Sequence, residues 1–152
     1  MNVSQKSSSI EQQRAEEKIF ALVEKKLSVT FEKNPVLYLS NNKYTYIQPD
    51  FYSAEHKIIG EIFAHIGKPK KAQDNKIAND ILKMLLLEKL SGQSYRKIIV
   101  VCDKKEEEKL KGLSALSESI RQFGIEVLYI EIGEELRDEI IKAQERQKMT
   151  NV

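Results

Sequence analysis

The chain has 152 residues, a formal net charge of +2 and one cysteine. A chain of this length fits one domain and needs no disulfide or structural metal to bury a core. The single Cys102 excludes an intramolecular disulfide and favours a reducing compartment. No segment approaches the roughly 18 apolar residues of a membrane span, and the N-terminus lacks the apolar core of a secretory signal. We therefore expect a cytoplasmic protein without a membrane segment.

Hydrophobic periodicity predicts the elements in chain order. Residues 1–9 are polar and rich in serine, and are predicted to be disordered. The elements that follow are a helix over 10–27, strands over 35–40, 43–48 and 57–66, a helix over 72–90, a strand over 97–102, a helix over 104–123, a strand over 125–132 and a helix over 134–147.

These elements predict one α/β domain over residues 10–148, with a frayed C-terminus at 149–152. Short connections join the first three strands, with a tight turn predicted at Asn41-Asn42. Such connections favour a three-strand antiparallel meander. The later strands alternate with helices, and such crossovers require parallel pairing. The expected fold is a mixed sheet with flanking helices.

Two carboxylates lie in an unusual position for a sheet. Pro49 and Asp50 end the second predicted strand, and Glu61 lies within the third, on the same strand face as Phe63 and His65. A carboxylate inside a sheet is costly unless its charge is compensated. Converging carboxylate oxygens suit Mg²⁺ or Mn²⁺, so the pair predicts a metal site made by Asp50 and Glu61.

Ordinary structural roles are the alternatives for these polar residues. Pro-Asp is a common turn pair, and an edge strand could expose Glu61. His65 could be a hydrogen-bonded surface residue, and Gln73 and Asp80 could simply border the apolar face of the helix over 72–90. Glutamates on the first helix, among them Glu16, are expected to be exposed and ordinary.

The order of helix, three strands, helix and strand over residues 10–102, with Pro49-Asp50 and Glu61, resembles the PD-(D/E)xK nuclease superfamily and its restriction-endonuclease-like fold. The resemblance implies that Asp50 and Glu61 hold one or two divalent metals. Phosphodiester hydrolysis needs charge neutralisation at the phosphate and a nucleophilic water, and a carboxylate-held Mg²⁺ supplies both. The resemblance therefore implies a metal-dependent nuclease.

The chain departs from the family pattern at one position. The family has a lysine two residues after the second acidic residue, whereas this chain has Phe63. Lys76 or Lys83, on the flank of the following helix, could supply the cation instead, as the family permits, and Lys76 is the better candidate because it is nearer the helix start. His65 could hold water or metal. The predicted catalytic residues are thus Asp50, Glu61, Lys76, Lys83 and His65.

A basic segment follows the strand that carries Glu61, and its position favours nucleic acid, DNA or RNA, as the partner. The predicted contacts are Lys68, Lys70, Lys71 and Gln73. Like any charge run, the segment could instead be a solvated face. Two other functions stay open: a member of the same fold that binds nucleic acid or protein without cutting, and an unrelated α/β domain with a ligand near Asp103. A homodimer is compatible with a lone domain of this kind.

Overall fold

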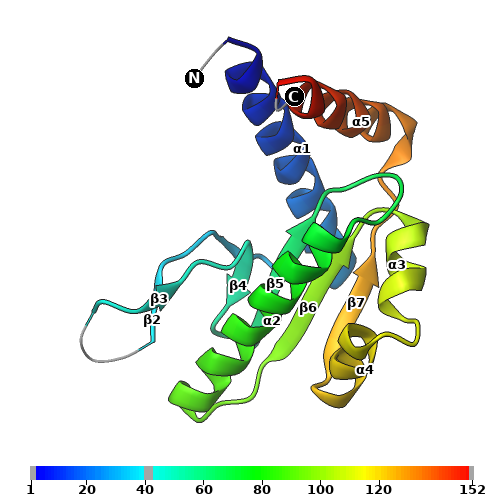
Figure 1. The fold of residues 1–152 in the computed structure, drawn as a ribbon. Helices are drawn as coiled ribbons and strands as arrows, with labels where there is room; N and C mark the ends of the chain where they lie inside the picture. Colours follow the sequence, from blue (N-terminus) through cyan, green and yellow to red (C-terminus); the bar gives the residue numbers. More distant parts are fainter. Residues whose placement is uncertain (1–2, 40–42, 151–152) are drawn as a thin grey trace.

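The computed structural model describes residues 3–39 and 43–150 and arranges a mixed sheet between two layers of helices (Figure 1). The helices are α1 (Val3–Leu27), α2 (Lys71–Ser91), α3 (Lys104–Leu110), α4 (Ala115–Gln122) and α5 (Gly133–Thr150). The strands are β1 (Glu32–Lys33), β2 (Leu37–Tyr38), β3 (Tyr46–Ile47), β4 (Phe51–Ser53), β5 (Ile58–Phe63), β6 (Arg96–Val101) and β7 (Ile125–Tyr129).

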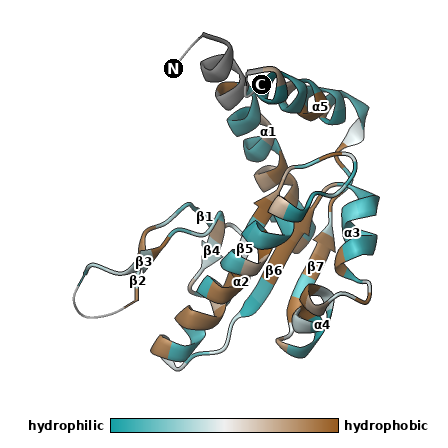
Figure 2. Cartoon of the chain, in the orientation of Figure 1, coloured by the Kyte–Doolittle hydropathy of each residue, from teal (hydrophilic) through white to brown (hydrophobic). Residues whose placement is uncertain are grey.

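The main sheet has the order β1-β4-β5-β6-β7. Its first three strands are antiparallel, and β5, β6 and β7 are parallel, as expected from the intervening helices. The α/β class and the mixed sheet are confirmed. Alternate residues of the central strands pack on opposite faces. Ile58 and Ile62 join α1 and α5 in one core, while Ile59 and Phe63 join α2, α3 and α4 in the other. Figure 2 shows β5 and most of β6 as apolar strands between these helices.

The predicted meander is wrong in its strand membership. The segments predicted as strands over 35–40 and 43–48 form a separate two-stranded hairpin, β2-β3, and the main sheet instead uses β1 and β4. Asp50 therefore comes directly before β4 rather than ending a strand over 43–48. The tight turn predicted at Asn41-Asn42 lies outside the described residues.

A close ring contact explains why β4 pairs where it does. Phe51 is fully buried and lies opposite Gly60 of β5. A Cβ atom on Gly60 would lie 1.9 Å from Cζ of Phe51, so only glycine leaves room for the ring. The short β4 is difficult to predict because its three residues are too few to show a strand pattern.

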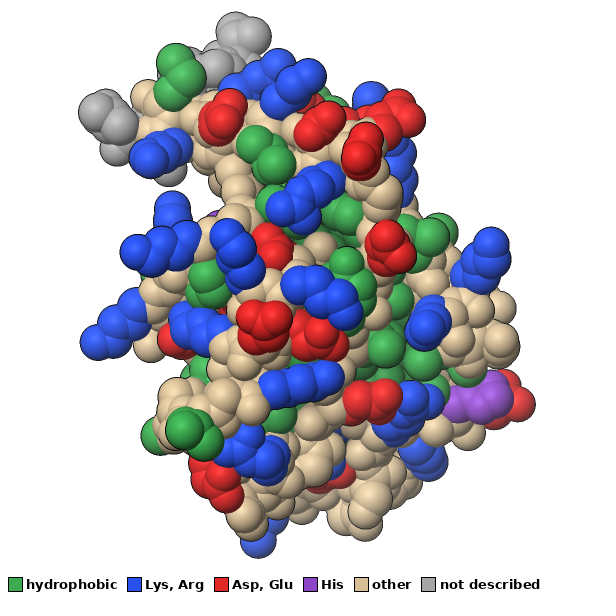
Figure 3. All heavy atoms as spheres, turned by 90° about the vertical axis from the view of Figure 1, so that its right-hand side faces the viewer, with side chains coloured by type: hydrophobic (Ala, Val, Ile, Leu, Met, Phe, Trp, Pro, Cys, Tyr) green, Lys and Arg blue, Asp and Glu red, His purple; other side chains and the backbone are tan. Residues whose placement is uncertain are grey.

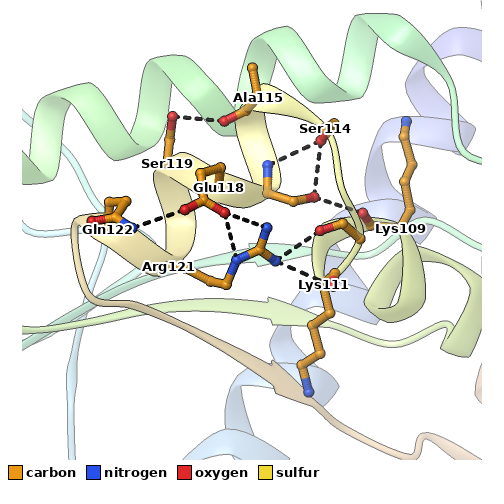
Figure 4. Close-up of polar contacts among 10 residues, drawn as sticks. Lys109, Lys111, Ser114, Ala115, Glu118, Ser119, Arg121 and Gln122 are labelled. Atoms are coloured by element: carbon orange, nitrogen blue, oxygen red, sulfur yellow. Dashed lines mark hydrogen bonds and ion pairs between the residues drawn. The ribbon is translucent and has the colours of Figure 1, made fainter.

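The helix predicted over 104–123 is also two helices. The Ser114 hydroxyl caps α4 by accepting from the backbone N–H of Ser117, and Arg121 donates to the carbonyl oxygens of Lys111 and Gly112 (Figure 4). These bonds satisfy backbone groups that a break would otherwise leave unpaired. The break lets Leu110 and Ile120 both reach the core below α2.

The outer helices are longer than the sequence predicts. α1 begins at Val3 rather than near residue 10, and α5 continues to Thr150, beyond the predicted end. The two helices pack together, and Lys18 bonds Glu139 at 3.2 Å. Over the described residues, no helix is both long enough and apolar enough to span a membrane.

Candidate active site

Asp50 is held at the entrance to β4 by a bond to the neighbouring strand. Its Oδ2 accepts the backbone N–H of Ile62 at 2.7 Å. The pairing of β4 with β5 ends at Phe51 and Gly60. The bond from the Asp50 side chain therefore adds one more link between the two strands beyond that pair. Pro49 before it is buried, which fixes the approach of the chain. Asp50 therefore has a defined position rather than a free place in a turn.

Glu61 faces Asp50 from β5. The pKa of Glu61 is raised to about 10, first because burial removes water from the carboxyl group and then because Asp50 lies beside it. Glu61 shares its strand face with Ile59 and Phe63, which pack under α2, so both carboxylates lie on the α2 side of the sheet. A like-charged, partly buried pair of this kind favours a shared proton or a bound cation.

Two further carboxylates approach the pair, one from each side. Burial raises the pKa of Glu16 on α1, and Asp50 adds to the effect, whereas Lys76 opposes it. Asp80 on α2 is 8% exposed, and burial raises its pKa as well, with Lys83 and Lys76 opposing and Asp50 adding. We call Asp50, Glu61 and Asp80 the carboxylate cluster. Glu16 is thus half-buried beside the cluster, not the ordinary exposed residue that the sequence predicts.

Lys76 of α2 lies over Phe63, the residue that stands where the resemblance implies a lysine. Its Nζ is 5.3 Å from the centroid of the Phe63 ring. Phe63 itself is buried in the core under α2. Lys83, about two helical turns further along, pairs with Asp80 at 3.9 Å. Both lysines therefore interact with the cluster, and Lys76 also interacts with Glu16.

A cavity of about 170 Å³ opens next to the cluster at the end of β5. Its walls come from α1, α2, α5 and the last residues of β5 and the segment after it, including Glu16, His65, Gln73, Lys76 and Gln144. Asp50 and Glu61 do not line this cavity. Glu16 and Lys76 do line it, and both also interact electrostatically with the cluster.

The residues predicted to contact nucleic acid lie in different places around the end of β5. Gln73 lines this cavity, and its Oε1 accepts the backbone N–H of Lys70 at 3.1 Å, so it also closes the first turn of α2. His65 and Lys70 lie together: burial lowers the pKa of His65, and Lys70 lowers it further. Lys68 and Lys70 line a second cavity, whereas Lys71 is exposed and lines neither of these two.

The donor set fits a weakly held Mg²⁺ or Mn²⁺ ion. Among the described residues, no three histidine, cysteine, aspartate or glutamate side chains come together as a ready-made metal cage. Mg²⁺ commonly binds through one or two carboxylates and keeps several waters, so Asp50 and Glu61 are sufficient donors. The crowding of the pair, seen in the raised pKa of Glu61, is what a divalent cation would relieve.

Comparison with protein-family models, curated proteins and solved structures finds no match. The resemblance to the nuclease superfamily therefore depends on the motif and the order of elements alone. The residue that sequence reasoning undervalued is Glu16. Ala15 and Ile19 mark the buried face of α1, but only the packing of this helix places Glu16 near Asp50.

Proposed function

We propose that this protein is a metal-dependent nuclease that hydrolyses phosphodiester bonds. The observation that carries the proposal is the convergence of Asp50 and Glu61 from adjacent strands, with Lys76 reaching over Phe63. Asp50 and Glu61 would hold Mg²⁺ or Mn²⁺. When bound, the cation would neutralise phosphate charge and lower the pKa of a water molecule.

The side chains around the pair have separate roles in this proposal. Lys76 would stabilise the negative charge that develops on the phosphate, since an ammonium group in a partly dry site is worth more than one in water. Glu16, whose pKa is raised, would hold or release a proton at the cavity wall. Asp80 would orient Lys83 through their 3.9 Å contact.

A second function is favoured by one specific observation. Phe63 occupies the position of the family's lysine, and it is a core residue. A domain that binds nucleic acid and metal without cutting would keep the carboxylates and have no need of a strand lysine. The two functions share the metal site and differ in catalysis, so one set of variants can separate them.

The test combines metal binding with cleavage. Single- and double-stranded DNA and RNA would be incubated with Mg²⁺ or Mn²⁺, and melting curves would be recorded with and without Mn²⁺. We expect Mn²⁺ to raise the melting temperature of the wild type and not that of Asp50→Asn. The amide keeps an acceptor for the Ile62 N–H, so the variant loses charge while it retains the backbone bond.

Asp50→Asn should lower cleavage by about a thousandfold, a loss typical of removing a metal ligand from a hydrolytic site. Lys89→Met, on the same helix α2 but at its far end, is the matched control and should cut at the wild-type rate. Metal binding without cleavage of any substrate would favour the binding domain. Equal melting shifts in wild type and Asp50→Asn would contradict both functions.

A further inference from the structure

A second cavity, of about 380 Å³, adjoins the first one at the carboxyl end of β5. One wall is the segment between β5 and α2, with His65, Gly67, Lys68 and Lys70, and the other wall is α5. His65 and Gln144 line both cavities, so the two spaces are neighbours along one surface. We call this second space the basic cavity.

The charges around the basic cavity are mostly positive. Its cations are Lys68, Lys70, Arg137 and Lys148, and its one carboxylate is Glu145. Within residues 3–39 and 43–150, the three lysines have no carboxylate within ion-pair distance, and Arg137 reaches Asp103 only at 4.0 Å. Figure 3 faces this side of the molecule and shows basic side chains where the upper helices meet the body. Cations from two separate elements thus surround one space.

Both walls are fixed by hydrogen bonds. Gln144 of α5 accepts the Ile66 N–H and donates to the Ile66 carbonyl oxygen, each at 2.9 Å. Asp103 accepts the Gly67 N–H at 2.7 Å, which ties the same segment to the end of β6. Gly67 has a φ of 104°, a conformation that favours glycine. The cavity is therefore preorganised, and a ligand would not have to order its walls first.

His65 lines both cavities. Its Nδ1 is buried and has no hydrogen-bond partner among the described residues. Burial lowers the pKa of His65 and the Lys70 charge lowers it further, while Asp103 acts in the opposite direction. An anion beside Lys70 would offset that positive charge and raise the pKa of His65. The pKa of His65 can therefore be used to detect an anion in the basic cavity.

We propose that the basic cavity is a phosphate-binding subsite in which Lys68, Lys70, Arg137 and Lys148 surround one phosphate group of the ligand. Because the two cavities share His65 and Gln144, the phosphate is expected to belong to the strand whose bond lies at the carboxylate cluster. This last step rests on the proposed nuclease function. The subsite itself rests only on the cavity and its charges.

The chain's histidines provide a direct test, because there are only two, His56 and His65. His56 lies in the turn after β4, with its Nε2 3.9 Å from Glu55, and serves as the internal control. NMR titration of both imidazoles would be recorded with sodium phosphate and with sodium chloride at matched ionic strength. We expect phosphate to raise the pKa of His65 and to leave that of His56 unchanged.

Variants on α5 test the residues themselves. Arg137→Gln should weaken phosphate binding about tenfold, since a charge-assisted pair with phosphate is lost. Lys148→Gln should weaken it less, and Lys142→Gln, an exposed residue of the same helix that does not line the cavity, should change nothing. Equal weakening by all three variants, or equal responses of His56 and His65, would overturn the subsite.

Two arms separate the sources of the phosphate. A single-stranded oligonucleotide without terminal phosphates should displace inorganic phosphate from His65 if the subsite takes strand phosphates. If only inorganic phosphate or a nucleoside monophosphate acts, the strand assignment is wrong and the subsite takes small ligands. Asp50→Asn should keep the His65 response even where cleavage is lost, so failure of the nuclease function and failure of the subsite give different results.

Discussion

Two buried carboxylates at the sheet show opposite electrostatics. Asp103, at the end of β6, is 4% exposed, and burial acts to raise its pKa, but bonds from the Gly67 and Lys105 N–H groups and the charge of Arg137 lower it overall. Glu61, on the neighbouring strand β5, has a pKa raised to about 10 by burial and by Asp50. Asp103 is stabilised by partners within the fold, whereas Glu61 is crowded against another carboxylate. We infer that Asp103 serves the structure and that Glu61 serves a ligand.

After the loss expected for Asp50→Asn, the next largest expected effect concerns Lys76, the cation near the carboxylate cluster. Lys76→Met should lower cleavage about a hundredfold with little change in stability, because the ammonium group acts on developing charge and its stem can still cover Phe63. Cleavage rates and melting curves of this variant beside Lys83→Met would check the result. A larger loss for Lys83→Met would transfer the role to Lys83.

Asp103→Ala should lower the free energy of unfolding by about 2 kcal/mol, since it removes the N-cap of α3 and leaves the Gly67 N–H unpaired. Asp103→Asn, which can still cap α3, should lose less. Denaturant unfolding of the two variants would measure both effects. If Asp103→Ala leaves the free energy of unfolding unchanged, Asp103 does not have the structural role that distinguishes it from Glu61.

Glu61→Gln should have the smallest of these effects, and it should raise the free energy of unfolding rather than lower it. A carboxyl group whose pKa is raised in the folded state contributes stability below its ordinary value near 4.5 and loses it as pH rises toward about 10. The amide avoids this loss, so the variant should be more stable than wild type by about 1 kcal/mol at pH 7 and equal to it near pH 4. Melting curves across pH without metal would test the trend. Destabilisation at pH 7 would show that Glu61 has a structural partner.

The sequence predicts the elements with a strong apolar pattern, α2 and β6, well and the short strands poorly. α2 and β6 differ from their predicted ranges by one residue at each end, because each has a strong apolar pattern that tertiary packing does not override. β1 and β4 have two and three residues, too few to show any period, and they are defined by pairing with distant partners. The break between α3 and α4 depends on side-chain bonds to backbone carbonyl groups, which no periodicity indicates.

The residues of the candidate site also differ in whether a regular pattern or only a distant contact identifies them. Residues of the strand predicted over 57–66, such as Glu61 and His65, could be assigned to one face by alternation, and Lys76 could be chosen because the next helix had to cover that face. Glu16 and Arg137 could not be selected in this way. They come from helices near the two ends of the chain, and only the packing of α1 against α5 brings those helices to the end of β5.

That packing has a consequence for when the site forms. The 170 Å³ cavity takes walls from Gln12 and Glu16 near the beginning of the chain and from Gln144 and Gln147 near residue 150. Contacts such as the Arg146–Glu11 ion pair and the Gln147–Gln12 bond close it. During synthesis, the strands that carry Asp50 and Glu61 emerge long before α5. A nascent chain therefore has the carboxylates without the cavity, and the site is completed only after the last helix has left the ribosome and docked on the first.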